Sequence, residues 1–408
     1  TSYYRVKALD ADGKVIYTSE GITVAGIGRT FKKTAYGVEF SWPADEVSGA
    51  TSYQLVVSAQ NQAIETKTVG AAVNSYTFIL APGTFYEIDV YAIVSGKKII
   101  VDQFAFVTEK LNAADNSDKG VTAKLLYLAE SINRTKFDNS MVTEMNVHSE
   151  STNKMTYMFF DAGEAFNLLM IAPLSSAFKG LKEGKDYDIG LNGIKCYNEK
   201  AVTALLEGIG EDGEGASILE TADVKAVYND PTYGYSNGLG DIKITDGKGK
   251  ITNKKGYLYD GVQPVGKRAY IPDYTNPSAW KNGFESVNVK ETDDYYEITV
   301  VIKPETVDPS NNKTKYHAGL VNAIESTNIS FGGDEEDTRI TTKVGKTTVT
   351  AKIDKSGRLL SYNVRSLYTM DMSSSMSMTG EGDALKISMA MKLEGTDVYA
   401  ATFKRYSK

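Results

Sequence analysis

Short runs of alternating apolar and polar residues, separated by turn residues, fill most of the first 110 positions. The runs cover residues 38–42, 52–59, 75–80, 86–94 and 99–107. Turn residues fall between them at Pro43, Gly49, Gly70, Pro82-Gly83 and Gly96. Because alternation with a period of two is typical of half-buried strands, this rhythm favours an antiparallel sandwich.

Two further alternating runs flank Asp12-Gly13 near the start of the chain. Asp-Gly between such runs predicts a hairpin, since both central residues of the tight turn need a positive φ. Two strands alone leave a hydrophobic face uncovered. We therefore expect residues 1–28 to be the C-terminal part of a truncated domain.

The run LAPGTFYEIDVYAIV, from Leu80 to Val94, resembles the E to F region of a fibronectin type III domain, with Trp42 and Tyr53 on the B-like and C-like strands. The resemblance implies such a domain over residues 29–110, in which Tyr86 forms a hydrogen bond back to the preceding loop. The opening YYRVKALDADGK resembles the last two strands of another such domain, although Ser2 stands at the position of Tyr86.

Residues 111–119 are polar and lack alternation, which predicts a linker. A helix should follow, because Leu125, Leu128, Ala129 and Ile132 fall on one helical face. Asp118 and Thr122 are its candidate caps. Later patterns predict a short helix over 200–208, a hairpin over Asp293-Asp294, a second helix over 315–327 and three C-terminal strands.

Methionine is concentrated in the last two predicted strands. Six of the eleven methionines lie between Met370 and Met391, and they follow a period of two. Methionine adapts to irregular shapes and is frequent on surfaces that accept variable apolar partners. We expect these strands to share an apolar face that binds a ligand through Tyr368, Met370, Met372, Met376, Met378, Met389 and Met391. The alternative is that these side chains fill a closed core beneath the helices.

The order of elements after residue 120 is helix, strands, second helix and long strands with a KIDKSGRLLSYNV hairpin. It resembles the half-barrels of LolA- and LppX-type lipoproteins. The resemblance implies an α+β half-barrel over residues 120–408, a curved antiparallel sheet with helices on its concave face. The whole chain is therefore expected to be mainly β.

Charge and composition exclude several classes of protein. The chain has 45 Lys and Arg against 52 Asp and Glu, a net charge of −7, so nucleic acid is not an expected partner. No run of eighteen apolar residues predicts a membrane-spanning segment. A single cysteine, Cys196, and two histidines, His148 and His317, predict no internal disulfide, no metal site and no cofactor.

The sequence contains only poor matches to catalytic motifs. Gly208, Gly210 and Gly213 match G-x-G-x-x-G, yet acidic residues between them would repel phosphate. Nothing in the sequence brings Cys196 beside a histidine, as a nucleophilic pair would need. We therefore expect no enzymatic activity.

Three hypotheses of function follow. The first is a secreted or cell-surface protein, of the kind found in Gram-positive bacteria, with fibronectin III-like spacers and a C-terminal domain that binds a lipid or another amphiphile. The second is an adhesin or structural surface protein that binds another protein through tyrosine-rich loops, with a host or cell-wall surface component as a further expected partner. The tyrosines concerned are Tyr228, Tyr233, Tyr235, Tyr257, Tyr259, Tyr270 and Tyr274. The third is an accessory part of a polysaccharide-degrading enzyme.

Overall fold

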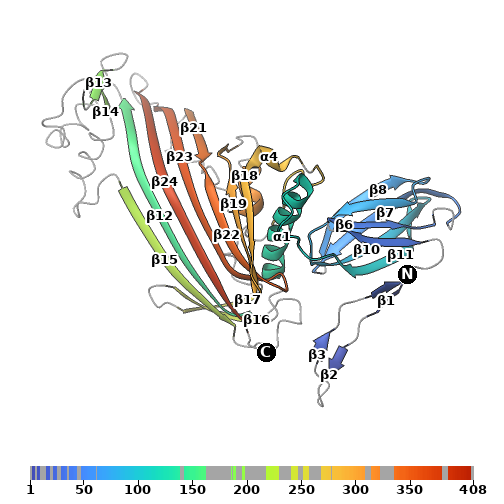
Figure 1. Cartoon of the computed structure of the whole chain (residues 1–408). Helices are drawn as coiled ribbons and strands as arrows, with labels where there is room; N and C mark the ends of the chain where they lie inside the picture. The colour runs from blue at the N-terminus through green and yellow to red at the C-terminus, as the bar shows by residue number, and fades with distance from the viewer. Residues whose placement is uncertain are drawn as a thin grey trace.

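The structure is a computed structural model of the chain (Figure 1). It describes residues 2–4, 7–9, 15–18, 22–24, 29–34, 36–43, 47–60, 62–137, 142–161, 185, 187–189, 195–197, 217–228, 240–246, 251–256, 268–276, 278–307, 314–321, 335–378 and 385–405. These residues form antiparallel sheets and a long helix, so the prediction of a mainly β fold is confirmed.

The first residues form two small antiparallel pairs. Strand β1 (Ser2–Tyr4) pairs with β4 (Ile22–Val24), and β2 (Lys7–Leu9) pairs with β3 (Val15–Thr18). The pairing of β2 with β3 confirms the predicted hairpin, although its turn at Asp12-Gly13 lies outside the described residues.

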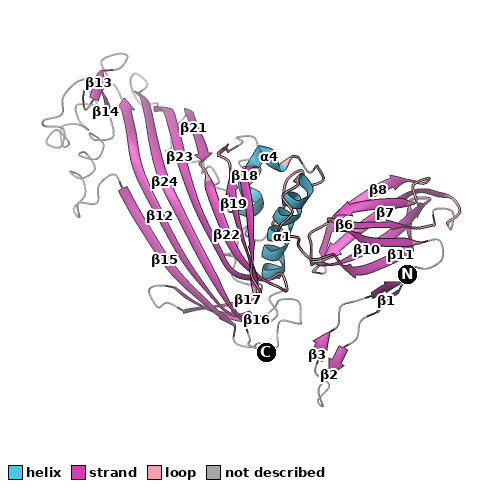
Figure 2. Cartoon of the chain, viewed as in Figure 1, coloured by secondary structure: helices cyan, strands magenta, loops and turns pink. Residues whose placement is uncertain are grey.

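Residues 30–107 form two facing sheets that enclose one core. Strands β5, β6 and β9 form one sheet, and the second has the order β11-β10-β7-β8. Strands β6, β7, β8, β10 and β11 are labelled in Figure 2. The bounds are β5 (Thr30–Thr34), β6 (Gly37–Ser41), β7 (Ala50–Ala59), β8 (Gln62–Gly70), β9 (Ser75–Ile79), β10 (Phe85–Val94) and β11 (Lys97–Val107). All five predicted runs are strands.

Strands β5 and β8 were not predicted from the sequence. Each lies at the edge of its sheet, and most of their side chains are exposed or half-buried. Because an edge strand with little burial needs no regular apolar positions, alternation is weak in TFKKT and QAIETKTVG. Pairing with a neighbouring strand decides their conformation.

Aromatic side chains fill the core between these two sheets. Trp42 and Tyr53 are buried, and their ring centroids lie 5.6 Å apart in an edge-to-face arrangement. Buried Tyr86 accepts a hydrogen bond on its hydroxyl oxygen from the backbone N–H of Ala81, at 3.2 Å. The hydrogen bond that the fibronectin resemblance implies for Tyr86 is therefore present.

Helix α1 (Asp118–Phe137) confirms the predicted helix, and Leu125, Leu128 and Ile132 are fully buried. Its cap differs from the prediction. The hydroxyl of Ser117 accepts from the N–H of Gly120 at 3.1 Å, whereas Asp118 lies in the first turn and Thr122 donates to the Asp118 carbonyl. Ser117 is the N-cap, because only a residue preceding the first turn can reach its free N–H groups.

The segment predicted as a linker is held in place at several points. Leu111 is buried in the core that α1 covers. The hydroxyl of Tyr36 donates to Asp115, and Lys124 donates to the side chain of Asn116 at 2.8 Å. The segment therefore joins the sandwich to the helix as a fixed connection.

Long antiparallel strands form a large sheet beyond α1. Its main path is β17-β16-β15-β12-β24-β23-β22-β19-β18, while β13, β14, β20 and β21 pair at its margins. The bounds are β12 (Val142–Asp161), β13 (Tyr187–Ile189), β14 (Lys195–Tyr197), β15 (Ser217–Tyr228), β16 (Gly240–Asp246), β17 (Ile251–Gly256), β18 (Phe284–Glu291), β19 (Tyr295–Ile302), β20 (Glu305–Thr306), β21 (Glu335–Val344), β22 (Thr347–Asp354), β23 (Leu359–Met378) and β24 (Leu385–Arg405).

Other predicted elements are confirmed in part. The hairpin over Asp293-Asp294 is β18-β19, and the three C-terminal strands are β22, β23 and β24. Two short helices, α4 (Trp280–Gly283) and α5 (His317–Leu320), are described, and α5 falls within the predicted second helix. The predicted helix over 200–208 and residues 322–327 lie outside the described residues.

Helix α1 lies between the sandwich and the large sheet (Figure 1). Its buried residues share a core with Met145, Tyr362, Val364 and Phe403, among others. We call the side of the large sheet that packs on α1 the inner face. On β23 the buried positions Tyr362, Val364 and Ser366 alternate with exposed ones, as a half-buried strand requires.

Replacing Tyr86 by Phe should lower the free energy of unfolding by about 1–3 kcal/mol, because the buried N–H of Ala81 loses its acceptor. Urea denaturation measures the change. Tyr76→Phe is the matched control, since the Tyr76 hydroxyl makes no hydrogen bond within the part of the chain that the structure describes. Equal stability losses in the two variants would contradict a special role for the Tyr86 hydroxyl.

Candidate functional site

The predicted methionine face lies on β23 and β24, which pair along almost their whole length. Met372 stands opposite Met391, Met370 opposite Leu393, and Met376 opposite Ile387. Since cross-strand partners share a face, the seven predicted residues all occupy inner-face positions. They continue the row that begins with Tyr362 and Val364 under α1.

Strand β12 adds two methionines that the sequence analysis did not assign. Met155 stands opposite Leu393 and Met158 opposite Met391, with a β-bulge between Met155 and Tyr157. The bulge shifts the alternation by one residue, so both methionines take inner-face positions. We call the inner-face positions of Met155, Met158, Met370, Met372, Met376, Met378, Met389 and Met391 the Met face.

The described side chains of this region are partly exposed. Met372 is buried, whereas Tyr368 and Met370 are half-buried. Only the backbone positions are described for the other members of the Met face, and the side chains of Met155, Met158, Met376, Met378, Met389 and Met391 lie outside the described residues. Contact of the Met face with a ligand therefore stays a prediction.

Tyr368 lies across the neighbouring strand. Its register partner is Gly395, and a Cβ at Gly395 would overlap the phenol ring. Glycine at this position lets the ring lie directly over β24. An aromatic ring therefore lines the border of the Met face that is nearer to α1.

A row of polar residues crosses the inner face between the Met face and the core under α1. Ser151 of β12 stands opposite Asp397 of β24, which stands opposite Ser366 of β23. Thr347, at the start of β22, continues the row, with its hydroxyl oxygen 3.0 Å from that of Ser366. We call Ser151, Asp397, Ser366 and Thr347 the polar row.

The polar row ends on a buried histidine and a glutamate. Nε2 of His317 lies 3.1 Å from Oγ1 of Thr347, and Nδ1 lies 2.5 Å from Oε2 of Glu305. Glu305 also accepts from the backbone N–H groups of Lys315, Tyr316 and His317. Burial alone would raise the pKa of Glu305, but these hydrogen bonds lower it overall.

The Glu305–His317–Thr347 order resembles that of a nucleophilic triad, because ionised Glu305 orients the imidazole and the imidazole faces a hydroxyl. However, His317 and Thr347 are both fully buried. A substrate carbonyl has no access to a hydroxyl enclosed in this way. We therefore interpret the group as a structural network that joins α5 to β20 and β22.

Cys196 does not complete a catalytic pair. It stands opposite Phe159 of β12, eleven residues from His148 on the same strand, a separation of about 36 Å at the usual strand rise. Both ring nitrogens of His317 are occupied by Glu305 and Thr347. Among the described residues, no cluster of His, Cys, Asp and Glu could hold a metal ion.

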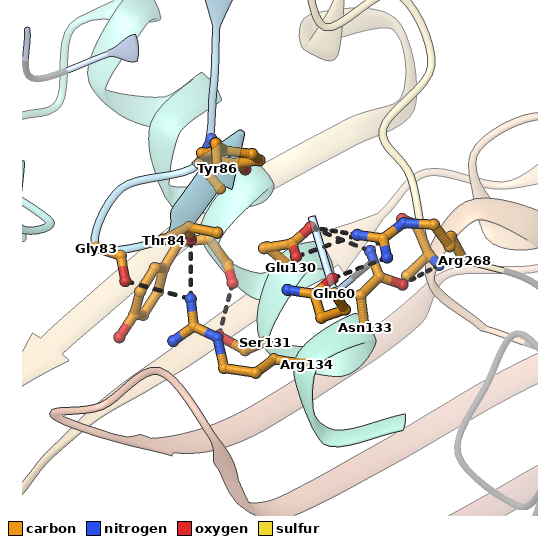
Figure 3. A network of polar contacts seen from close by, with 12 residues as sticks. Gln60, Gly83, Thr84, Tyr86, Glu130, Ser131, Asn133, Arg134 and Arg268 are labelled. Carbon is orange, nitrogen blue, oxygen red and sulfur yellow. Dashed lines mark hydrogen bonds and ion pairs between the residues drawn. The ribbon is translucent and has the colours of Figure 1, made fainter. Parts of the chain in front are cut away.

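The junction between the sandwich and α1 carries a second group of polar contacts (Figure 3). Arg268 donates to Glu130 of α1 at 2.9 Å and to Gln60 of the sandwich at 2.8 Å. One turn further along α1, Arg134 donates to the Gly83 carbonyl at 3.2 Å and to the Thr84 hydroxyl at 3.0 Å. These bonds fix the sandwich against the helix.

A pocket of about 470 Å³ lies beside this junction. Its lining comes from both folding units, namely Gly83, Lys110, Leu111, Tyr127, Glu291, Thr292, Asp293, Tyr296 and Lys355. Nζ of Lys355 lies 2.8 Å from Glu291 and 3.9 Å from the centroid of the Tyr296 ring. Lys355, Glu291 and Tyr296 therefore satisfy one another within the pocket lining.

Two residues of the tyrosine-rich middle segment are described with their side chains. The Tyr270 side chain is exposed, whereas the hydroxyl of Tyr274 donates to Glu65 of the sandwich. Burial and this hydrogen bond raise the pKa of Tyr274. Tyr274 thus contributes to a contact within the chain. The side chains of Tyr228, Tyr233, Tyr235, Tyr257 and Tyr259 lie outside the described residues.

Comparisons with known proteins leave the family open. No family model and no curated protein matches the chain. Among solved structures, the rhamnogalacturonan lyase YesW aligns with a TM-score of 0.16 and 11% identity, over 88% of this chain and 51% of the lyase. The chain thus spans about half the length of that protein, and so low a TM-score carries no argument about fold or activity. Within the described residues, no helix is long and apolar enough to cross a membrane.

Asp397→Asn should stabilise the free protein at pH 7. Burial raises the pKa of Asp397, while the hydrogen bond from Ser151 lowers it, and the net shift is upward. An acid whose pKa rises on folding holds its proton more tightly in the folded state. The stability of the protein therefore falls as the pH rises above 3.8, the ordinary pKa of an aspartate side chain. The gain in Tm of the variant should therefore shrink as the pH falls through the raised pKa. A gain independent of pH would contradict this origin.

Proposed function

We propose that this chain is a non-catalytic bacterial protein, secreted or held at the cell surface, that binds an apolar or amphiphilic ligand on the Met face. The sandwich of residues 29–110 serves as a spacer that carries the ligand-binding sheet. The proposed partners are a lipid or another amphiphile, and a host or cell-wall component.

The proposal assigns the sandwich to the fibronectin type III fold and residues 120–408 to a LolA/LppX-like half-barrel. Support for the first comes from the strand order of the two sheets and from the hydrogen bond between Tyr86 and Ala81. Support for the second comes from the long antiparallel strands and from α1, which packs on their inner face.

The observation that carries the proposal is the register of β12, β24 and β23. Met158, Met391 and Met372 stand in one cross-strand row, continued by Ile340 of β21. Flexible thioether side chains in adjacent rows form a surface that adapts to chains of different shape. Each methylene buried there contributes about 0.8 kcal/mol, so a long acyl chain binds without specific polar contacts.

Native mass spectrometry tests the proposal directly. The chain is purified from a lipid-containing bacterial lysate, and its mass is compared before and after delipidation with organic solvent. We expect an additional mass of lipid size before delipidation and its loss afterwards. Repeated preparations that yield only apoprotein would contradict a carrier role.

A charge placed on the Met face distinguishes a binding groove from a closed core. Met370→Glu should abolish ligand binding and leave the fold largely intact, because Met370 is half-buried and water reaches the new carboxylate. Met145→Glu is the matched control, since Met145 is fully buried in the core under α1. That variant should lose more than about 3 kcal/mol of stability. Circular dichroism during urea denaturation measures both.

Equal destabilisation by the two variants would show that the Met face is sealed. That outcome would favour the adhesin hypothesis, in which the Met strands only fill a core. Tyr270, with 52% of its surface exposed, is the described residue available for such a contact.

A further inference from the structure

The polar row lies beside the end of the Met face that is nearer to α1. Along β24 the inner-face positions run from Met391 through Leu393 and Gly395 to Asp397. Asp397 thus lies about 20 Å from Met391 at the usual strand rise. An extended hydrocarbon chain over the Met face would place one of its ends near this carboxylate.

Asp397 differs from the other members of the polar row in its bonding. Thr347 and Ser366 bond to each other, and Thr347 also contacts His317. Asp397 accepts from the hydroxyl of Ser151 at 2.7 Å on one oxygen, Oδ1. An ionised carboxylate can accept about four hydrogen bonds, so Asp397 keeps acceptor capacity for a ligand.

The charge around Asp397 is one-sided. No lysine or arginine occupies an inner-face position near Asp397 on the three central strands of the described structure. The positions concerned run from Ser149 to Met155 on β12, from Leu393 to Tyr399 on β24 and from Val364 to Met372 on β23. Arg365 stands opposite Val398, on the outer face. The inner face therefore presents a carboxylate without a neighbouring cation from these three strands.

An aromatic ring near this carboxylate suits a cationic headgroup. The ring of Tyr368 lies over Gly395, one row from Asp397, and an aromatic face attracts cations.

We infer that Asp397 is a specificity-determining residue of this site, and that the preferred ligand is an amphiphile whose headgroup is a protonated amine. The hydrocarbon chain lies over Met370, Met372 and Met391, and the ammonium group pairs with Asp397 beside the ring of Tyr368. The inference rests on the proposed function, since it requires that the Met face binds a chain.

Three ligands with the same chain and different headgroups test the inference. The binding of dodecylamine, dodecanol and dodecanoate is measured by isothermal titration calorimetry, below the aggregation concentration of each. We expect dodecylamine to bind at least about tenfold more tightly than dodecanol, as one charge-assisted hydrogen bond allows. Dodecanoate should bind least tightly, because it meets a like charge.

Asp397→Asn should remove the advantage of dodecylamine and leave the affinity for dodecanol unchanged. Glu394→Gln is the matched control. It removes a carboxylate from the same strand, but Glu394 is exposed and stands opposite Thr369 on the outer face. The control should keep the preference for dodecylamine.

The outcomes separate the two proposals. Failure of all three ligands to bind would overturn the proposed function. Equal affinities for the three ligands would overturn only the inference about the headgroup. A preference for dodecylamine that survives Asp397→Asn, or that Glu394→Gln also removes, would assign it to the general negative charge of the protein and overturn the role of Asp397.

Discussion

The antiparallel register of β12, β24 and β23 is the constraint on which the rest of the large sheet depends. These strands pair over about twenty residues each, and side chains alternate between faces. A slip of one residue would move Tyr362, Val364 and Met372 from the inner face to solvent. Burial of Tyr362 and Val364 beneath α1 specifies the register, and the pairing carries that register along the strands to the methionines.

The inner face is divided into regions with different physical properties. Under α1 it is a closed apolar core, then a polar row crosses it, and the Met face follows. His317, Glu305 and Thr347 satisfy one another and hold α5 in place. Asp397 has no such group of partners among these residues, and burial raises its pKa. Buried groups that reduce stability are common at functional sites, where binding requires them.

The contact between the sandwich and α1 restricts how the two folding units move. Arg268 and Arg134 bind the sandwich at Gln60 and at the Gly83-Thr84 turn, and both bonds involve planar guanidinium groups with fixed donor directions. Tyr274 adds a bond to Glu65. The sandwich is therefore held in a fixed orientation against α1, because hydrogen bonds at several points of their contact oppose rotation.

The sequence by itself determined the elements whose burial is periodic: the strands of the sandwich core, α1, the hairpin over Asp293-Asp294 and the methionine rows of β23 and β24. The sequence pattern did not predict β5 and β8, since edge strands bury too little to need alternation. It placed the cap of α1 at Asp118 or Thr122, although Ser117 fills that position. Only the tertiary structure decided that Met155 and Met158 share a face, because a β-bulge reverses the alternation. It also brought Ser151, Asp397, Ser366 and Thr347 into one row, since pairing between strands distant in the chain leaves no local pattern.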